Sequence, residues 1–214
     1  MRLYIVRHGE TKRNIERRLS GREEVPLNER GIRQAIQTRD YLKEVDFDLI
    51  ISSPSERARN TAEIIADGRD VPFWTDERIH EIDWGDWDGH PNAGDSEEMA
   101  LEMRLFYHDP LHFHGAPHGE TLIDVRERGR DFFRELISKR ELYGKNILIL
   151  THACAVRGIL NLLYENPDDF WQNGVPGNCS VNIVEINHGR GTIVLADKIC
   201  YDQSLAGNYY TLDD

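Results

Sequence analysis

The sequence predicts an α/β fold, a three-layer αβα sandwich whose mostly parallel central sheet ends in a late β-hairpin. Short apolar runs of strand length alternate along the chain with longer segments of helical periodicity, as in a sheet covered by helices on both faces. Polar pairs directly follow three of these runs: Arg7-His8, Ser52-Ser53 and Thr151-His152. Ligands bind beyond the carboxyl ends of strands in such sheets, so these pairs mark the candidate site.

The predicted strands are short and apolar. The first covers residues 2–6, and two more cover 49–51 and 147–150. Residues 181–186 alternate between apolar and polar side chains, turn through a segment with two glycines and continue over 192–195. This last pattern predicts the hairpin.

Three helices are predicted between the strands. Apolar residues at helical spacing follow Asn28, a suitable N-cap, and continue to Leu42. A long amphipathic helix covers 122–137 and ends near Gly144, and another covers 153–164. Arg57 lies at the start of a further helical segment.

The segment from about 85 to 119 departs from this alternation. It contains Pro91, Pro110 and Pro117 and several glycines, and its helical periodicity is confined to 99–107. Long irregular connections of this kind commonly cover functional sites. We therefore predict one domain, residues 1–214, in which 85–119 forms a lid or cap.

Composition and charge exclude several classes of protein. With 39% hydrophobic and 30% charged residues the chain resembles a soluble enzyme, and no run approaches the ~18 apolar residues of a membrane span. The net charge of −12 argues against a nucleic-acid partner, because nucleic acids are bound by basic surfaces. The three cysteines are too few and scattered for a disulfide framework, and no signal-peptide pattern is visible, so we expect a cytoplasmic protein.

The triplet Arg7-His8-Gly9 carries the first chemical signal. A histidine beside an arginine, with a glycine that permits close backbone approach, suits an attack on a phosphate group. Three residues alone recur by chance, so the triplet gains meaning only from its context.

Several motifs follow the triplet in a characteristic order. They cover Arg7–Asn14, Ser20-Gly21, Pro26–Gly31, Ser53–Ala62, Glu81–Gly89, Gly119–Thr121 and Thr151-His152. Together they resemble the histidine phosphatase superfamily, specifically its phosphoglycerate mutase-like branch with the R-H-G-E-T-x-x-N signature. The resemblance extends from residue 2 to about residue 164.

The resemblance implies a cofactor-independent phosphatase in which His8 attacks phosphorus and becomes phosphorylated. It also implies that Arg7, Arg57 and His152 neutralise the phosphoryl oxygens and that Asn14 adds a hydrogen bond. A cluster of cations suits phosphoryl transfer, which depends mainly on positioning and charge stabilisation. The implied partner is a small phosphorylated metabolite.

Glu81 resembles the general acid and base of the family. It would protonate the leaving oxygen and then help to activate water. To donate a proton near neutral pH it needs a pKa raised by burial or by nearby negative charge.

Further substrate contacts are expected from residues next to these motifs. They are Gly9, Ser20, Gly21, Ala153, Arg59 and Trp84. The backbone N–H of Ala153, at a helix start, is expected to face the substrate anion. For Arg59 a surface charge, and for Trp84 a packing role, remain open alternatives.

Two other features are expected to have no catalytic role. Four histidines cluster in the predicted cap, but prolines interrupt any regular presentation of ligands, so no metal site is predicted. They are His108, His112, His114 and His118. Cys154 is not expected to be a nucleophile, because cysteine phosphatases need an arginine six residues later and that position is Leu160.

Departures from the family pattern favour a phosphatase over a mutase. Ser20 replaces a frequent glutamine or threonine, Ala153-Cys154 replaces a glycine-rich pair, and the 91–118 segment has Arg104 as its single arginine or lysine. A mutase must retain a bisphosphate intermediate, which requires additional cations. The alternatives are a phosphoglycerate mutase and a catalytically silent binder of phosphorylated ligands, and a homodimer is left open.

Overall fold

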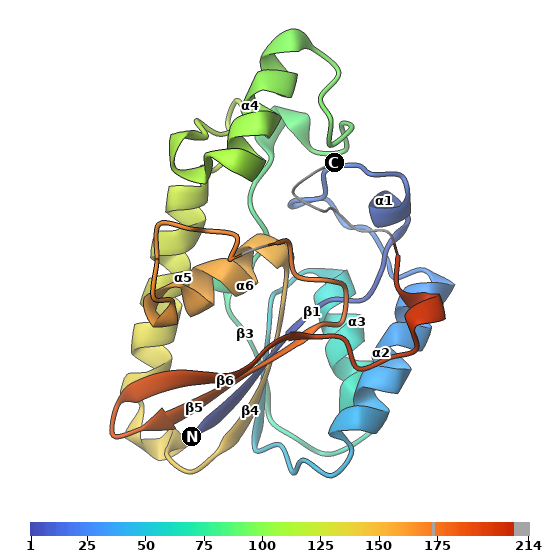
Figure 1. The fold of residues 1–214 in the computed structure, drawn as a ribbon. Helices are drawn as coiled ribbons and strands as arrows, with labels where there is room; N and C mark the ends of the chain where they lie inside the picture. The colour runs from blue at the N-terminus through green and yellow to red at the C-terminus, as the bar shows by residue number, and fades with distance from the viewer. Residues whose placement is uncertain (173, 208–214) are drawn as a thin grey trace.

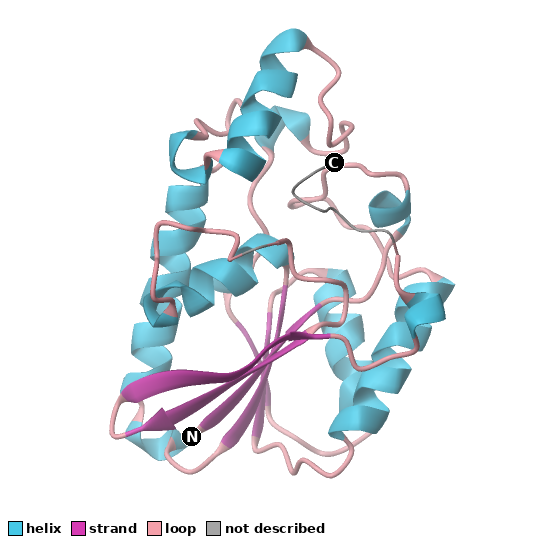
Figure 2. Cartoon of the chain, in the orientation of Figure 1, coloured by secondary structure: helices cyan, strands magenta, loops and turns pink. Residues whose placement is uncertain are grey.

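The apolar runs of the sequence form one six-stranded sheet (Figures 1 and 2). The computed structural model describes residues 1–172 and 174–207. The strand order is β3-β2-β4-β1-β5-β6, in which the first four strands are mutually parallel, β5 is antiparallel to β1, and β6 is antiparallel to β5. The strands are β1 (Arg2–Arg7), β2 (Leu49–Ser52), β3 (Phe73–Thr75), β4 (Asn146–Thr151), β5 (Val181–Asn187) and β6 (Arg190–Lys198).

The helices form the two outer layers of the predicted sandwich, which the structure confirms. In Figure 1, α5 and α6 lie on one face of the sheet, and α2 and α3 lie on the other. The helices are α1 (Lys12–Ile15), α2 (Glu29–Leu42), α3 (Glu56–Ala66), α4 (Glu97–His108), α5 (Leu122–Ser138) and α6 (Ala153–Leu160). Asn28 caps α2 as predicted, accepting a hydrogen bond from the N–H of Gly31 (2.7 Å).

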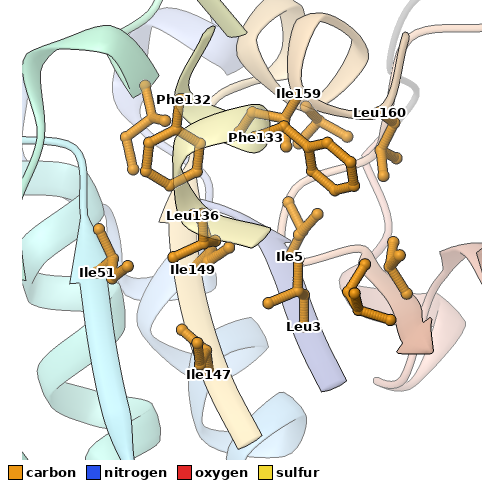
Figure 3. Close-up of a cluster of buried hydrophobic side chains, with 14 of the residues drawn as sticks. Leu3, Ile5, Ile51, Phe132, Phe133, Leu136, Ile147, Ile149, Ile159 and Leu160 are labelled. Atoms are coloured by element: carbon orange, nitrogen blue, oxygen red, sulfur yellow. The ribbon is translucent and has the colours of Figure 1, made fainter. Parts of the chain in front are cut away.

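The alternation of side chains along each strand divides the core into two layers. Leu3 and Ile5 of β1 pack under α5 and α6, in the cluster shown in Figure 3, whereas Tyr4 and Val6 pack under α2 and α3. Burying each side chain of this size contributes about 1.5–3 kcal/mol. The sheet is therefore anchored on both faces, and its strand ends are held in register.

Two elements differ from the prediction. β3 was not predicted, because its three residues are all exposed and lie at the edge of the sheet, where no apolar run is needed. The helix predicted over 153–164 is α-helical only to Leu160 and continues as a 3-10 turn over Asn161–Leu163.

The 85–119 segment lies beyond the carboxyl ends of β1 and β4, with α4 outermost (Figure 1). Met99, Met103 and Phe106 of α4 are buried against Trp84 and Trp171. A third apolar cluster therefore fixes α4 to the rest of the molecule. Among the described residues, no helix is both long enough and apolar enough to span a bilayer.

Candidate active site

The parallel register brings the predicted site residues together. Arg7 pairs with Thr151 at the ends of β1 and β4, and the N–H of His8 donates to the carbonyl oxygen of Thr151 (2.9 Å). The next residue on each chain is a histidine, and the His8 and His152 ring centroids are 5.0 Å apart. Strand ends far apart in sequence thus converge because neighbouring parallel strands end at the same edge.

His8 has the geometry of a neutral nucleophile. Its side chain is buried, and Nδ1 lies 2.7 Å from the carbonyl oxygen of Gly9, which can only accept a hydrogen bond. Nδ1 therefore carries the proton and Nε2 carries the free lone pair. Burial, together with the positive charges of Arg57 and Arg7, holds the pKa of His8 well below its ordinary value.

Arg57 and Arg7 supply buried positive charge next to His8. Arg57 is fully buried and donates to the carbonyl oxygens of Gly21 (2.8 Å) and Glu23 (3.2 Å). Burial lowers the pKa of Arg57 to about 10, so it remains protonated at neutral pH. Arg7 donates to the carbonyl oxygen of Pro176 (2.5 Å). The Nε atoms of both arginines have no hydrogen-bond partner among the described residues.

His152 is held by two serines that follow β2. Its Nε2 lies 2.8 Å from Ser53 Oγ and 3.2 Å from Ser55 Oγ, while Nδ1 has no partner within the part of the chain described. The ring of His80 stacks on the His152 ring, with 5.5 Å between centroids and 6° between planes. Burial, followed by the charge of Arg57, holds the pKa of His152 well below its ordinary value. Both site histidines are therefore neutral at pH 7.

Glu81 is bound to the first turn of α6. Its Oε1 accepts from the N–H groups of Ile82 (3.0 Å) and Cys154 (3.1 Å), and its Oε2 accepts from the N–H of Ala153 (3.0 Å). A helix N-terminus favours a carboxylate in this position. The Ala153 N–H, predicted to face the substrate anion, is thus occupied by Glu81.

A pocket opens beside these groups. Seven of the predicted site residues line it: Arg7, His8, Asn14, Ser20, Glu81, Trp84 and Ala153. Trp84 also packs against Phe106 (5.0 Å between centroids), so its packing and lining roles coexist. Arg57 and His152 lie adjacent to His8 but do not line the pocket.

Three predicted substrate contacts have other surroundings. A Cβ on Gly9 would lie 2.6 Å from the carbonyl oxygen of Gly31, and one on Gly21 would lie 2.7 Å from that of Ile82. These glycines allow close packing of backbones and do not line the pocket. Arg59 is exposed on α3 and also does not line it, in agreement with the alternative of a surface charge.

Sequence reasoning missed a clamp on the segment that carries Glu81. Arg128 of α5 donates to the carbonyl oxygens of Arg78 (2.7 Å), His80 (2.7 Å) and Glu81 (3.0 Å). The same guanidinium forms two hydrogen bonds with Glu120 (2.8 and 2.9 Å). Glu120 belongs to a recognised motif, whereas Arg128 had no sequence signal other than its place two helical turns further on.

The four cap histidines are not among the residues that line the pocket, whereas Cys154 is. Among the residues that the structure describes, no group of three His, Cys, Asp or Glu side chains is suited to hold a metal. Three of the four cap histidines instead each lie beside one carboxylate: His112 near Asp109, His114 near Glu102 and His118 near Asp86. Burial and the neighbouring Glu81 hold the pKa of the Cys154 thiol well above its ordinary value, which disfavours a thiolate nucleophile.

Known proteins are similar to this chain in sequence and in fold. Residues 3–198 match the family described as the histidine phosphatase superfamily (branch 1). The chain is 32% identical over 181 residues to the uncharacterized phosphatase PhoE of Bacillus subtilis, covering 84% of this chain and 86% of that protein. It is 34% identical over 164 residues to an adenosylcobalamin/alpha-ribazole phosphatase of Escherichia coli, covering 76% and 77%. Proteins named probable phosphoglycerate mutase also occur among its relatives.

A solved structure agrees with these sequence matches. The structure of Bacillus stearothermophilus YhfR superposes with a TM-score of 0.84 at 30% identity, covering 92% of this chain and 97% of that chain.

Proposed function

The chain belongs to branch 1 of the histidine phosphatase superfamily and is a phosphatase, and we propose that it hydrolyses small phosphomonoesters through a phosphohistidine on Nε2 of His8. The observation that carries this proposal is the state of His8. It is neutral, its Nδ1 proton is committed to Gly9, and it lines a pocket that also contains a carboxyl group.

In the first step, the Nε2 lone pair of His8 forms a bond to phosphorus while the bond between phosphorus and the leaving oxygen breaks. Glu81 gives its proton to that oxygen, so the alcohol departs neutral. Three of the four in-plane lone-pair positions of the Glu81 carboxylate accept backbone N–H groups. The remaining position, on Oε2, is where the transferable proton resides in this mechanism.

In the second step, water attacks the phosphohistidine and Glu81 takes a proton from it. The bond between phosphorus and Nε2 breaks, inorganic phosphate leaves, and both His8 and Glu81 return to their initial states. Arg7 and Arg57 oppose the negative charge of the phosphoryl group throughout, and their unpartnered Nε–H groups are the donors that we assign to this role. Asn14 and His152 complete the phosphoryl site in the proposal.

Hydrolysis, as opposed to a mutase reaction, is supported by the charges around the pocket. Among the described residues that line it, the arginines and lysines are Arg7 and Arg18 only. Arg18 is exposed and lies 3.9 Å from Glu16. A mutase would need further cations to hold the second phosphoryl group of a bisphosphate.

The setting of the enzyme is part of the proposal. We propose a single domain in which residues 85–119 act as a cap, because Asn92, Phe106 and Tyr107 of that segment line the pocket. A cytoplasmic location is supported by three free cysteines, and the net charge of −12 disfavours nucleic acid. Light scattering of the purified protein will distinguish a monomer from the homodimer left open by the sequence.

The test compares the parent with His8→Ala and with His112→Ala, a control at an exposed cap histidine. We expect the parent and the control to release phosphate from p-nitrophenyl phosphate without added bisphosphate, and His8→Ala to lose at least about 10³-fold in rate. Rapid acid-free quenching should trap a phosphoenzyme only when His8 is present. Equal rates for His8→Ala and the parent would refute the proposal, and isomerisation of phosphoglycerate without phosphate release would favour the mutase.

A further inference from the structure

Much of the pocket lining is aromatic or aliphatic and is not used by the proposed chemistry. Six such residues line the pocket: Leu19, Trp84, Phe106, Tyr107, Trp171 and Val175. These side chains come from segments far apart in sequence, and two of them lie on α4 in the cap segment. We call these six residues the apolar wall.

The apolar wall is preformed. Phe106 is its hub, with ring centroids 5.0 Å from Trp84 and 5.0 Å from Trp171. The indole N–H of Trp171 donates to the carbonyl oxygen of Phe106 (2.7 Å), so no polar atom of that ring is left to demand water. The Phe106–Trp171 pair packs edge-to-face and the Phe106–Trp84 pair is tilted, and such aromatic contacts fix the orientation of each ring.

Positive charge is scarce in the pocket lining, where the described arginines and lysines are Arg7 and Arg18. Arg7 lies next to His8 at the phosphoryl end, and Arg18 is exposed, donating to the carbonyl oxygen of Gly89 (2.7 Å) and lying 3.9 Å from Glu16. An anionic leaving group placed against the wall would lose water without gaining a partner, which is costly. An apolar leaving group would gain from the same desolvation.

Within the described part of the chain, Ser20 and Asn92 each place an unpartnered polar atom among the lining residues. Ser20 Oγ and Asn92 Oδ1 belong to residues that line the pocket, and both are buried without a hydrogen-bond partner among the described residues. Buried polar atoms are normally satisfied, so a bound molecule is their natural partner. A hydroxyl or amide on the leaving group would serve this purpose.

From this lining we infer that the enzyme selects phosphomonoesters whose leaving group is an uncharged, largely apolar or aromatic body with a hydroxyl or amide on it. Esters that carry a second anionic group, such as a carboxylate or another phosphate, are disfavoured. The inference rests on the proposed hydrolysis at His8. It assigns to the cap segment the selection of the substrate, because α4 supplies the hub of the wall.

The test uses two esters that differ in polarity but not in the intrinsic reactivity of the leaving group. These are 3-phenylpropyl phosphate and 4-carboxybutyl phosphate, both derived from primary alkyl alcohols. We expect kcat/KM to favour the phenylpropyl ester by about 10- to 100-fold, which is the scale of burying one aromatic group. Adding an amide to the phenyl ring should raise kcat/KM further in the parent and not in Asn92→Ala.

Phe106→Leu and Phe113→Leu form a matched pair of variants. Phe113 belongs to the same aromatic cluster, 5.2 Å from Phe106, but does not line the pocket. We expect Phe106→Leu to reduce the preference for the phenylpropyl ester several-fold, and Phe113→Leu to leave it unchanged at similar loss of stability. Thermal unfolding of both variants separates folding from selectivity.

The outcomes distinguish this inference from the proposed function. Equal kcat/KM for the two esters, or a preference for the carboxylate, with release that still depends on His8 would overturn the inference alone. A preference that Phe113→Leu lowers as much as Phe106→Leu would also overturn the assignment to the wall. No His8-dependent release from either ester or from p-nitrophenyl phosphate would refute both.

Discussion

Replacing Glu81 by glutamine changes one oxygen of a carboxylate that accepts three backbone hydrogen bonds. The amide oxygen can keep two of them, those from Ile82 and Cys154, only if the amide NH₂ faces the N–H of Ala153. The opposite orientation keeps one bond and loses two. Glutamine is therefore expected to take the first orientation and to leave the Ala153 N–H buried without an acceptor.

The cost follows from this geometry. A buried donor left without a partner costs about 1–3 kcal/mol. We therefore expect Glu81→Gln to lower the free energy of unfolding by about 2 kcal/mol and Tm by about 4–8 °C for a chain of this size. Because glutamine has no proton to transfer, kcat should fall by about 10²–10⁴-fold with little change in KM.

Urea unfolding and steady-state kinetics measure the two effects separately. The control is Glu44→Gln, at an exposed glutamate in the connection between α2 and β2, and it should change neither quantity. An unchanged unfolding midpoint for Glu81→Gln would show that the three N–H groups do not hold the carboxylate. An unchanged kcat across pH 5–8 would remove Glu81 from the mechanism.

Three further outcomes are expected. Burial lowers the pKa of His80 from 6.5 to about 3 and those of His8 and His152 well below their ordinary values, so the folded state binds fewer protons than the unfolded state below pH 6.5. Stability should fall as pH decreases from 6.5, and a His80→Gln variant that keeps the full slope in urea titrations at pH 7 and 5 would contradict this. Arg128→Lys should lower kcat about 10-fold or more with KM nearly constant, because lysine cannot span three carbonyls and Glu120; rates equal to the parent's would show that the clamp does not position Glu81. Incubation with EDTA should not alter the rate, and a large loss that added divalent metal restores would reveal a metal requirement.

The sheet and its covering helices could be predicted because burial imposes patterns on the sequence. β1, β2 and β4 are buried along nearly their whole length, so they appear as continuous apolar runs. β3 could not be found in this way, since Phe73–Thr75 are exposed and owe their strand conformation to pairing with β2. Edge pairing is a tertiary effect that leaves no periodicity.

The site residues likewise fall into those that a local motif identifies and those that depend on tertiary packing. His8, Glu81 and His152 could be located because they sit in local motifs at strand ends. The partners of Glu81 could not, because the N–H groups of Ala153 and Cys154 reach it only when α6 is docked beside the 78–83 segment. Likewise the packing role of Gly9 against Gly31 depends on how α2 meets the loop after β1. Sequence motifs identify reactive groups, whereas the donors that orient them are set by how the elements assemble.

The hydrogen bond from the Trp171 indole to the carbonyl of Phe106 has a consequence for protein engineering. The substrate-facing surface is shared between α4 and a loop that lies over sixty residues downstream, so neither can be exchanged alone. In a chimera that imports residues 85–119 from a relative, the Trp171 indole would face a helix whose side chains and carbonyl positions are not matched to it. Transplanting selectivity between such enzymes therefore requires both stretches to be moved as a unit, with the intervening catalytic scaffold left in place.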